Sequence, residues 1–231
     1  MAVGAAIAER FLCARFGEWM SHKIYAYISD GGIQEEISQG AGRIAGFLGL
    51  HNLIMFYDSN DIQLSTETKA VTTEDTAMKY KAWGWNVIEI DGHNAQQIRD
   101  ALKKANNEKE KPTIIIGKTI MGKGVVKADG TSYERQCSTH GMPLSEAGAS
   151  FEKTIENLGG DPSNPFVIFP EVKDYYQNKR QEKIAEAAKR KSIQKDWEGK
   201  NPELAKKLNM FLSGELPQLN YEEIIQKENI A

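Results

Sequence analysis

Two apolar runs, each ending in a polar residue, constrain the fold of this 231-residue chain most strongly. The first run, IYAYISDGG, covers residues 24–32, and the second, LIMFYDSND, covers residues 53–61. Between them, residues 33–50 carry small and apolar residues at helical spacing. A strand, a helix and a second strand in this order form a βαβ unit, so the two strands are expected to be parallel and to end at the same edge of a sheet.

Asp30 and Asn60 are the polar residues at these two strand ends. Neighbouring strands lie about 4.8 Å apart, so both side chains can reach one ion. A carboxylate, an amide oxygen and a nearby carbonyl are hard oxygen ligands that suit Mg²⁺, which also binds phosphate esters. The crevice at this edge of such a sheet is the expected ligand site. Because Asp and Asn are also common turn residues, the spacing alone leaves that simpler interpretation open.

The first half of the chain continues this alternation of strands and helices. The pattern predicts an α/β fold of three layers, in which helices cover both faces of a mostly parallel sheet. The predicted elements are helices over residues 2–17, 35–48, 74–83 and 94–106, and strands over residues 24–29, 53–58, 86–90 and 112–118.

The second half of the chain has a different pattern. Residues 119–150 are rich in glycine and polar residues, which predicts a long functional loop. After Pro170 the sequence predicts a charged, solvated helix. Further helices are predicted near residues 202–212 and 220–227, which makes the carboxyl-terminal part a helical extension.

Composition excludes several classes of partner. A net charge of −3 with 26% charged residues gives no cationic surface for nucleic acid. Cys13 and Cys137 lie far apart, which indicates neither a disulfide framework nor a metal-binding knuckle and fits a reducing cytosol. No apolar run approaches the ~20 residues that cross a bilayer, and the first residues lack the basic region of a signal peptide. We therefore expect a cytoplasmic protein without a nucleic acid or membrane partner.

The motifs at the strand ends resemble those of the transketolases. SDGG at residues 29–32, followed later by Asn60, resembles the thiamine diphosphate motif, which begins with Gly-Asp-Gly and ends in Asn. The stretch DGGIQEEISQGAGRIAGFLGLHNLIMFYDSNDIQL is similar to transketolase sequences nearly throughout, and the resemblance is strong over residues 1–150. Further motifs follow in the family's order, namely TTEDTAMKYKAWGWNVIEIDGHN at 72–94, KPTIIIGKTIMGKG at 111–124 and HGMPLSEA at 140–147.

The resemblance implies a site for thiamine diphosphate and Mg²⁺, with Ca²⁺ as the alternative ion. Asp30, Asn60 and the backbone carbonyl of Ile62 match the family's metal ligands, and together they are called the candidate metal site below. Gly31 matches the position where the chain passes close to the diphosphate, which glycine permits because it has no Cβ.

Four other residues match functional positions of the family. His140 matches a histidine near the diphosphate and the bound sugar, where it can stabilise a phosphate or a developing oxyanion. Glu35 opens the helix after the metal-binding turn, where a carboxylate is favourable with the helix dipole. The resemblance gives it a catalytic role as a buried glutamate at a dimer interface. Leu64 and Met121 match apolar positions around the thiazolium ring, although ordinary core packing also fits them.

The resemblance also implies the reaction and the partners. Transketolases, enzymes of the pentose phosphate pathway, move a two-carbon ketol unit from a ketose phosphate to an aldose phosphate. We expect a diphosphate-binding and Mg²⁺-binding domain over residues 1–165, truncated at its amino end, and a helical extension over residues 166–231 toward an absent pyrimidine-binding domain. Sugar phosphates, and either a homodimer or a complementary transketolase subunit, are the expected partners, and activity would need the complementary chain.

Two other functions stay open. The first is a different thiamine enzyme, such as a 1-deoxyxylulose-5-phosphate synthase or the α subunit of a 2-oxoacid dehydrogenase. The motifs HGMPL and DTAMKYKAWGWNVI argue against that alternative. The second is a binding module or remnant without catalytic activity.

Overall fold

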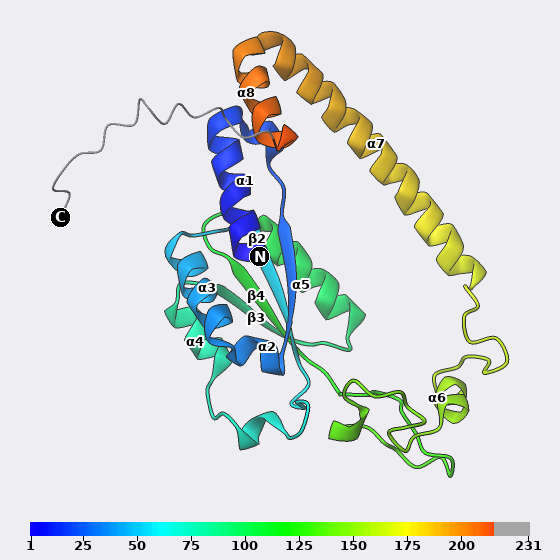
Figure 1. Ribbon diagram of the computed structural model, residues 1–231. Coiled ribbons are helices and arrows are strands. Elements are labelled where there is room, and N and C mark those ends of the chain that lie inside the picture. The colour runs from blue at the N-terminus through cyan, green and yellow to red at the C-terminus, as the bar shows by residue number, and fades with distance from the viewer. Residues whose placement is uncertain (215–231) are drawn as a thin grey trace.

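A single parallel sheet forms the centre of the molecule (Figure 1). The structure is a computed structural model that describes residues 1–214. Every pair of neighbouring strands is parallel, and the strand order is β1-β2-β4-β3. This confirms the predicted sheet, with strand bounds that agree to within one residue. The strands are β1 (Ile24–Ser29), β2 (Leu53–Ser59), β3 (Asn86–Asp91) and β4 (Thr113–Lys118).

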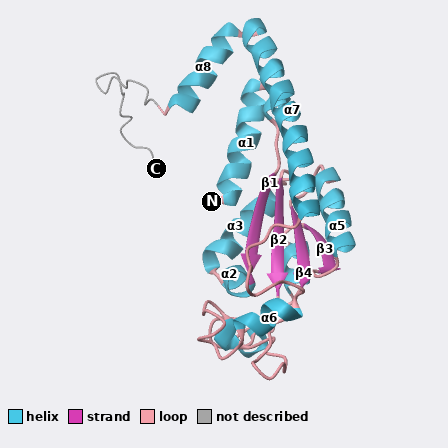
Figure 2. Ribbon diagram, turned by 90° about the vertical axis from the view of Figure 1, so that its right-hand side faces the viewer, coloured by secondary structure: helices cyan, strands magenta, loops and turns pink. Residues whose placement is uncertain are grey.

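Helices pack on both faces of this sheet, which confirms the predicted three-layer α/β fold (Figure 2). α1 (Ala2–Phe16), α3 (Glu36–Phe47) and α4 (Thr76–Ala82) contribute to the larger core cluster on one face. α5 (Ala95–Asn107) contributes to the smaller cluster on the other face. Residues of β2 and β4 enter both clusters: Leu53, Met55, Tyr57, Ile114 and Ile116 the larger, and Ile54 and Ile115 the smaller.

The strand register brings the ends of β1, β2 and β4 to the same edge of the sheet. Ser29 at the end of β1 pairs with Asp58 of β2, and Asp58 pairs with Gly117 of β4. Asp30 and Asn60 follow directly after β1 and β2. The sheet therefore places both predicted ligands at its carboxyl edge.

The connection after β1 differs in detail from the predicted turn. A short helix, α2 (Asp30–Gln34), begins at Asp30 itself. Glu35 then has an extended backbone, with φ −60° and ψ 133°, which separates α2 from α3. The predicted helix over residues 35–48 is therefore α3, and Glu35 is its N-cap residue.

Residues 119–150 form the predicted long loop, which contains a short 3₁₀ turn, η3 (Cys137–Thr139), and an isolated β-bridge between Val126 and Ser132. Two other 3₁₀ turns are η1 (Glu18–Met20) and η2 (Thr68–Ala70). A helix that the sequence pattern did not predict, α6 (Phe151–Asn157), follows the long loop. Its N-cap is Ser150, whose side chain accepts a hydrogen bond from the backbone N–H of Lys153.

α7 (Pro170–Lys200) and α8 (Pro202–Ser213) form a helical arm beyond the sheet (Figure 1). Residues 170–193 are all exposed, which confirms the predicted solvated helix. The arm returns to α1, where Phe16 packs against Trp197 and Phe11 packs against Phe211. The helix predicted near residues 220–227 lies outside the described residues.

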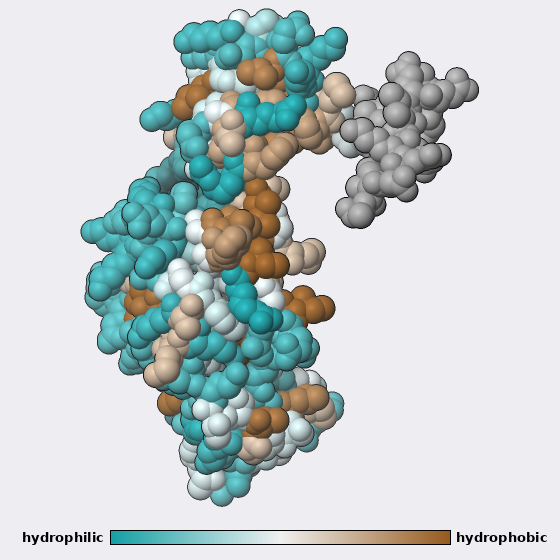
Figure 3. Space-filling view, turned by 90° about the vertical axis from the view of Figure 1, so that its left-hand side faces the viewer, coloured by the Kyte–Doolittle hydropathy of each residue, from teal (hydrophilic) through white to brown (hydrophobic). Residues whose placement is uncertain are grey.

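Apolar surface is exposed on the side of the molecule where α1 and α3 lie (Figure 3). On α3 and the residue after it, the exposed apolar side chains are Ile37, Ile44, Phe47 and Leu48. Across residues 1–214, no helix combines the length and the apolar character needed to cross a membrane.

Candidate functional site

The Asp30 carboxylate is buried and receives three hydrogen bonds. Asp30 as a whole residue is only 1% exposed. The Tyr57 hydroxyl donates to Oδ1 at 2.8 Å, and the backbone N–H groups of Asn60 and Asp61 donate to Oδ2 at 3.0 and 3.2 Å. Burial raises the pKa of Tyr57 well above its ordinary value, and the hydrogen bond to Asp30 raises it further, so the hydroxyl stays protonated and donates.

Over the described residues, this carboxylate has no cationic side chain beside it. Among residues 1–214, no nitrogen of lysine, arginine or histidine lies within 4.0 Å of the Asp30 oxygens. A buried carboxylate is costly unless it is paired with a positive charge or binds a metal. A carboxylate offers about four lone-pair positions, and three are used here. The Asp30 carboxylate therefore keeps a lone pair that a cation can bind, and a bound cation would offset the cost of burying the negative charge.

Asn60 contacts this carboxylate through its backbone, and its side-chain oxygen is partly free. Asn60 is 8% exposed, its Oδ1 accepts a hydrogen bond from the backbone N–H of Ile62 at 3.0 Å, and its Nδ2 donates to Asp58 at 3.4 Å. Oδ1 has a second lone pair for another partner. The structure thus brings Asp30, Asn60 and Ile62 together, and their oxygen donors fit the hard-oxygen chemistry of Mg²⁺.

Two basic side chains lie next to the candidate metal site. Asp61 has a left-handed backbone, with φ 66°, and its carboxylate faces both. Lys118 at the end of β4 lies 3.1 Å from Asp61 Oδ1 and donates to Ser59 Oγ at 2.8 Å. Arg135 of the long loop lies 3.8 Å from Asp61 Oδ2. Lys118 and Arg135 therefore form a charged cluster with Asp61 at this edge of the sheet.

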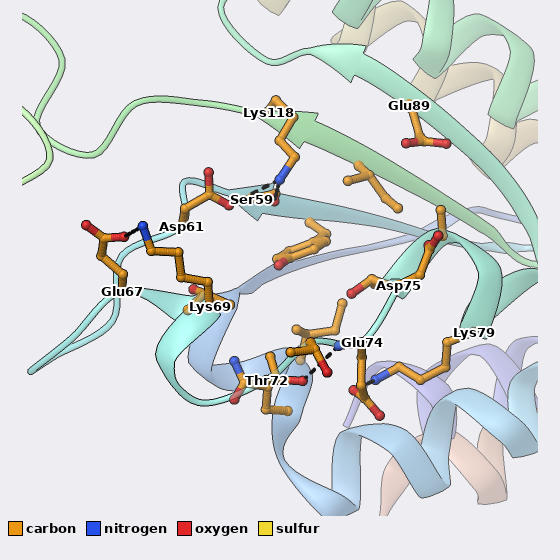
Figure 4. A pocket seen from close by; sticks show the side chains of 18 of the residues that line it. Ser59, Asp61, Glu67, Lys69, Thr72, Glu74, Asp75, Lys79, Glu89 and Lys118 are labelled. Atoms are coloured by element: carbon orange, nitrogen blue, oxygen red, sulfur yellow. Dashed lines mark hydrogen bonds and ion pairs between the residues drawn. The ribbon is translucent and has the colours of Figure 1, made fainter.

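A pocket of about 490 Å³ opens at this edge (Figure 4). It lies between the ends of β2 and β4 and the beginning of α4. This volume is in the range of small-molecule and cofactor sites. Its charged lining residues are Asp61, Glu67, Lys69, Glu74, Asp75, Lys79, Glu89, Lys118 and Arg135.

Gly31 follows Asp30 and is exposed. A Cβ at this position would meet no atom within 4 Å, so the packing of the described chain does not require glycine there. The space beside Gly31 is open to a ligand. The predicted close approach of a diphosphate therefore fits the geometry and stays a prediction.

The structure does not bring the other predicted residues into contact with the candidate metal site. Leu64 is 72% exposed, so it does not belong to the core of the described residues. The backbone carbonyl of Met121 accepts a hydrogen bond from the Arg135 N–H at 2.9 Å, which ties this part of the loop to the side chain beside Asp61. Glu35 is exposed rather than buried in this single chain.

His140 lies in the long loop, directly after η3. Its Nδ1 is buried, and across the described residues it has no hydrogen-bond partner. The Tyr133 hydroxyl holds the surrounding loop through a hydrogen bond to the Ala147 carbonyl at 2.8 Å. The roles of His140 and Glu35 in catalysis stay predictions.

Four residues near the site were not singled out from the sequence: Tyr57, Asp58, Lys118 and Arg135. Tyr57 and Asp58 stand inside the motif that carries the resemblance, directly before the predicted ligand Asn60. Successive strand residues point to opposite faces of the sheet. The sequence could therefore have shown that Tyr57 and Asp58 approach the predicted ligands from different faces.

A parallel sheet with oxygen donors and basic side chains at its carboxyl edge is typical of α/β proteins that bind a ligand at this edge. Comparisons with known proteins identify the family. Residues 1–217 match the family model described as transketolase, thiamine diphosphate binding domain. The chain belongs to this family.

Similar proteins are transketolases. Transketolase 2 of Escherichia coli is 36% identical over 238 residues, which cover 98% of this chain and 33% of the relative. A transketolase of Staphylococcus aureus is 34% identical over 229 residues, which cover 96% and 33% of the two chains. The solved structure of transketolase from Leishmania mexicana superposes with a TM-score of 0.86 at 27% identity and covers 98% of this chain and 34% of its own. The chain thus spans about a third of the length of these relatives.

Proposed function

We propose that this chain binds thiamine diphosphate and Mg²⁺ as part of a transketolase. The observation that carries the proposal is the buried Asp30 carboxylate, which lies beside Asn60 at the carboxyl edge of the sheet. Within the described part of the chain, no cationic side chain lies within 4.0 Å of it. Membership of the thiamine diphosphate binding family supports the choice of cofactor.

Each residue of the site has a separate task in this proposal. Asp30, Asn60 and the Ile62 carbonyl hold Mg²⁺, and Gly31 leaves room for the diphosphate. Thiamine diphosphate supplies the carbanion chemistry for moving a two-carbon ketol unit from a ketose phosphate to an aldose phosphate. Lys118 and Arg135 add positive charge beside the phosphate-binding edge.

The remaining predicted residues act around the substrate and the thiazolium ring. His140 donates a hydrogen bond to a phosphate or to a developing oxyanion. Leu64 and Met121 pack against the thiazolium ring. Glu35 acts at an interface with a second copy or with a complementary subunit, which would bury its exposed carboxylate.

Calorimetry of cofactor binding tests the metal-site proposal. The chain is titrated with thiamine diphosphate at saturating Mg²⁺, and Asp30→Ala is expected to abolish binding, because it removes the charged ligand of the ion. Asp91→Ala is the matched control, since Asp91 ends β3 at the same edge and is exposed. Thermal unfolding confirms that both variants are folded. Equal affinity of the wild type and Asp30→Ala would contradict the proposal.

Sugar phosphates are the proposed substrates. Transketolase of Pichia stipitis has been solved in complex with sedoheptulose-7-phosphate, and a mutant of that enzyme with fructose-6-phosphate. Both structures superpose on this chain with a TM-score of 0.83 at 26% identity. The pentose phosphate pathway and a cytoplasmic location belong to the same proposal.

Activity is proposed to require further polypeptide, because this chain spans about a third of its relatives. We expect no ketol transfer to ribose 5-phosphate by this chain alone. A polypeptide carrying the remaining two-thirds of a transketolase is expected to restore turnover when mixed with it. Transfer by the purified single chain would contradict this requirement.

The proposed organisation is a diphosphate-binding domain over residues 1–165 and a helical extension over residues 166–231. Limited proteolysis tests this division. Cleavage is expected first in the exposed segment before α7, around residues 161–169, and the product ending there is expected to retain binding of Mg²⁺ and thiamine diphosphate. A product that loses cofactor binding would contradict the division.

A further inference from the structure

Two successive residues of β2 lie behind the two side-chain ligands of the candidate metal site. Successive residues of a strand point to opposite faces of the sheet. Tyr57 lies in the core cluster that includes α1, α3 and α4, and Asp58 follows it on the strand. The strand can therefore support Asp30 from one face and Asn60 from the other.

Tyr57 fixes the position of the Asp30 carboxylate. Its hydroxyl donates to Oδ1 at 2.8 Å, whereas the two backbone donors, Asn60 and Asp61, both bind Oδ2. Tyr57 is the one side chain among the described residues that hydrogen-bonds to this carboxylate. Its ring is buried in the core, so the hydroxyl is held in place.

Asp58 fixes the orientation of the Asn60 amide. Asp58 Oδ2 accepts a hydrogen bond from Asn60 Nδ2 at 3.4 Å, and Asp58 Oδ1 accepts one from the Thr119 hydroxyl. Asp58 is thus held in place by the residue that follows β4.

The orientation matters because the two ends of an amide have the same shape and opposite hydrogen-bonding character. An acceptor at the nitrogen end, supplied by Asp58, and a donor at the oxygen end, supplied by Ile62 N–H, both favour the same orientation. In the flipped orientation the amide would turn its NH₂ group toward the cation. Groups behind metal ligands set ligand orientation in this way, and their loss typically costs 10–100-fold in metal affinity.

We propose that Tyr57 and Asp58 are positioning residues, which hold the oxygens of Asp30 and Asn60 ready for the metal ion. This inference rests on the proposed function, because it assumes that these oxygens bind Mg²⁺. Neither residue binds the ion itself.

Calorimetry with Mg²⁺ and thiamine diphosphate tests the inference on the full chain. Tyr57→Phe and Asp58→Ala are each expected to weaken binding by about tenfold or more. Asp58→Asn is expected to stay within about threefold of the wild type, because its amide oxygen can still accept from Asn60 and its NH₂ can donate to the Thr119 hydroxyl. Thermal unfolding checks that the variants are folded.

Matched controls distinguish the loss of ligand positioning from two other effects. These are the loss of a negative charge and the loss of a tyrosine hydroxyl elsewhere in the chain. Tyr25→Phe removes a hydroxyl that donates to Asn106 at 2.8 Å, and Asp91→Asn removes one negative charge from the end of β3. Both are expected to bind like the wild type. If Asp58→Asn loses as much affinity as Asp58→Ala, charge rather than orientation is responsible, and the role of Asp58 is overturned.

Asp30→Ala distinguishes failure of the positioning inference from failure of the proposed function. If it abolishes binding while Tyr57→Phe and Asp58→Ala bind like the wild type, the positioning inference alone is wrong. If Asp30→Ala binds like the wild type, or if the wild-type chain shows no Mg²⁺-dependent binding, the proposed function fails and the inference fails with it.

Discussion

An asparagine stands at each end of β2, and each lies beside a buried carboxylate. Asn52 precedes the strand and contacts Glu9, and Asn60 follows it and contacts Asp30. Glu9 is 2% exposed and Asp30 is 1% exposed, and each carboxylate receives three hydrogen bonds. An asparagine beside a buried carboxylate therefore occurs at both edges of the sheet.

The amino edge is a structural network that joins α1 to β2. Glu9 accepts hydrogen bonds from Asn52 Nδ2 at 2.6 Å, from the His22 N–H at 3.0 Å and from the Cys13 thiol at 3.2 Å. Burial, together with the neighbouring Glu9, raises the pKa of Cys13 to about 12, so the thiol stays protonated and donates. Asn52 Nδ2 also donates to the Ala6 carbonyl at 2.9 Å. These contacts fasten α1 to the beginning of β2.

The carboxyl edge differs in what surrounds the pair. There the asparagine contacts the carboxylate through its backbone, and its side-chain oxygen accepts a hydrogen bond from the Ile62 N–H. At the amino edge, Asn52 Oδ1 is buried and has no hydrogen-bond partner among the described residues, so a free oxygen does not distinguish the two edges. The adjacent residues Ser59 and Asp61 line a pocket of about 490 Å³, together with Lys118. Neither Glu9 nor Asn52 lines this pocket, so the pocket and its basic side chains are what make the carboxyl edge the candidate site.

Substituting the two asparagines tests this comparison with the largest expected effect. Asn60→Ala is expected to abolish Mg²⁺-dependent binding of thiamine diphosphate, because it removes an oxygen ligand, whereas the fold should stay intact. Asn52→Ala is expected to leave cofactor affinity unchanged and to lower the free energy of unfolding. Calorimetry and urea denaturation of both variants check these results. A loss of affinity in Asn52→Ala would break the comparison.

Substitution of His140 tests whether the long loop contributes a residue to the candidate site at the carboxyl edge. In the enzyme reconstituted with a complementary polypeptide, His140→Ala is expected to lower turnover by about a hundredfold, the size found for one lost donor to a developing oxyanion. Cofactor affinity should change much less, since Mg²⁺ holds the diphosphate. Steady-state kinetics and calorimetry measure the two quantities. An unchanged turnover would remove His140 from the site.

Glu9 tests the structural side of the comparison. Glu9→Ala leaves three donors without their acceptor, so the free energy of unfolding is expected to fall by about 2 kcal/mol. Glu18→Ala is the control, because its contact with Arg10 is exposed and should contribute less than about 1 kcal/mol. Urea denaturation of both variants measures the difference. Equal stabilities of the two variants would show that the amino-edge network contributes nothing.

The sequence predicted the sheet and the place of the candidate site because both depend on local patterns. The apolar runs define β1 and β2, and the order of strand, helix and strand places Asp30 and Asn60 at one edge. The pattern did not reveal Glu9 as a buried residue, because a charged residue in a helix is usually exposed. Its burial depends on Asn52, which is distant in sequence.

The supporting residue Tyr57, the helix α6 and the place of His140 were not predicted, because each depends on the path of a turn or loop. The hydrogen bond from Tyr57 to Asp30 depends on the fold of the turn after β1, which begins a short helix. α6 follows a glycine-rich loop, and its only local sign was Ser150 at the N-cap. The place of His140 depends on the path of a long loop that is held by its own hydrogen bonds, and strand periodicity carries no information about it.

The smallest predicted effect is a dependence of stability on pH that belongs to the amino edge. Burial raises the pKa of Glu9, but the hydrogen bonds from the His22 N–H and the Cys13 thiol outweigh it, so its pKa is lowered in the folded state. Burial, and then the charges of Lys23 and Arg10, lower the pKa of His51. Both groups bind fewer protons in the folded state than in the unfolded state, so each contributes stability that is lost as the pH falls.

The two groups act in different pH ranges. The contribution of His51 begins to fall near its unfolded pKa of about 6.5, and that of Glu9 begins to fall near about 4.3. Each group changes the free energy of unfolding by at most about 1.4 kcal/mol per pH unit. Urea denaturation from neutral to acidic pH is expected to show a shallower decline for His51→Gln below neutral pH and for Glu9→Gln at lower pH. The contributions of exposed carboxylates are the same in the wild type and in each variant, so they cancel in the difference. If the free energy of unfolding depends on pH in the same way in the wild type and the variants, this account of the amino edge is wrong.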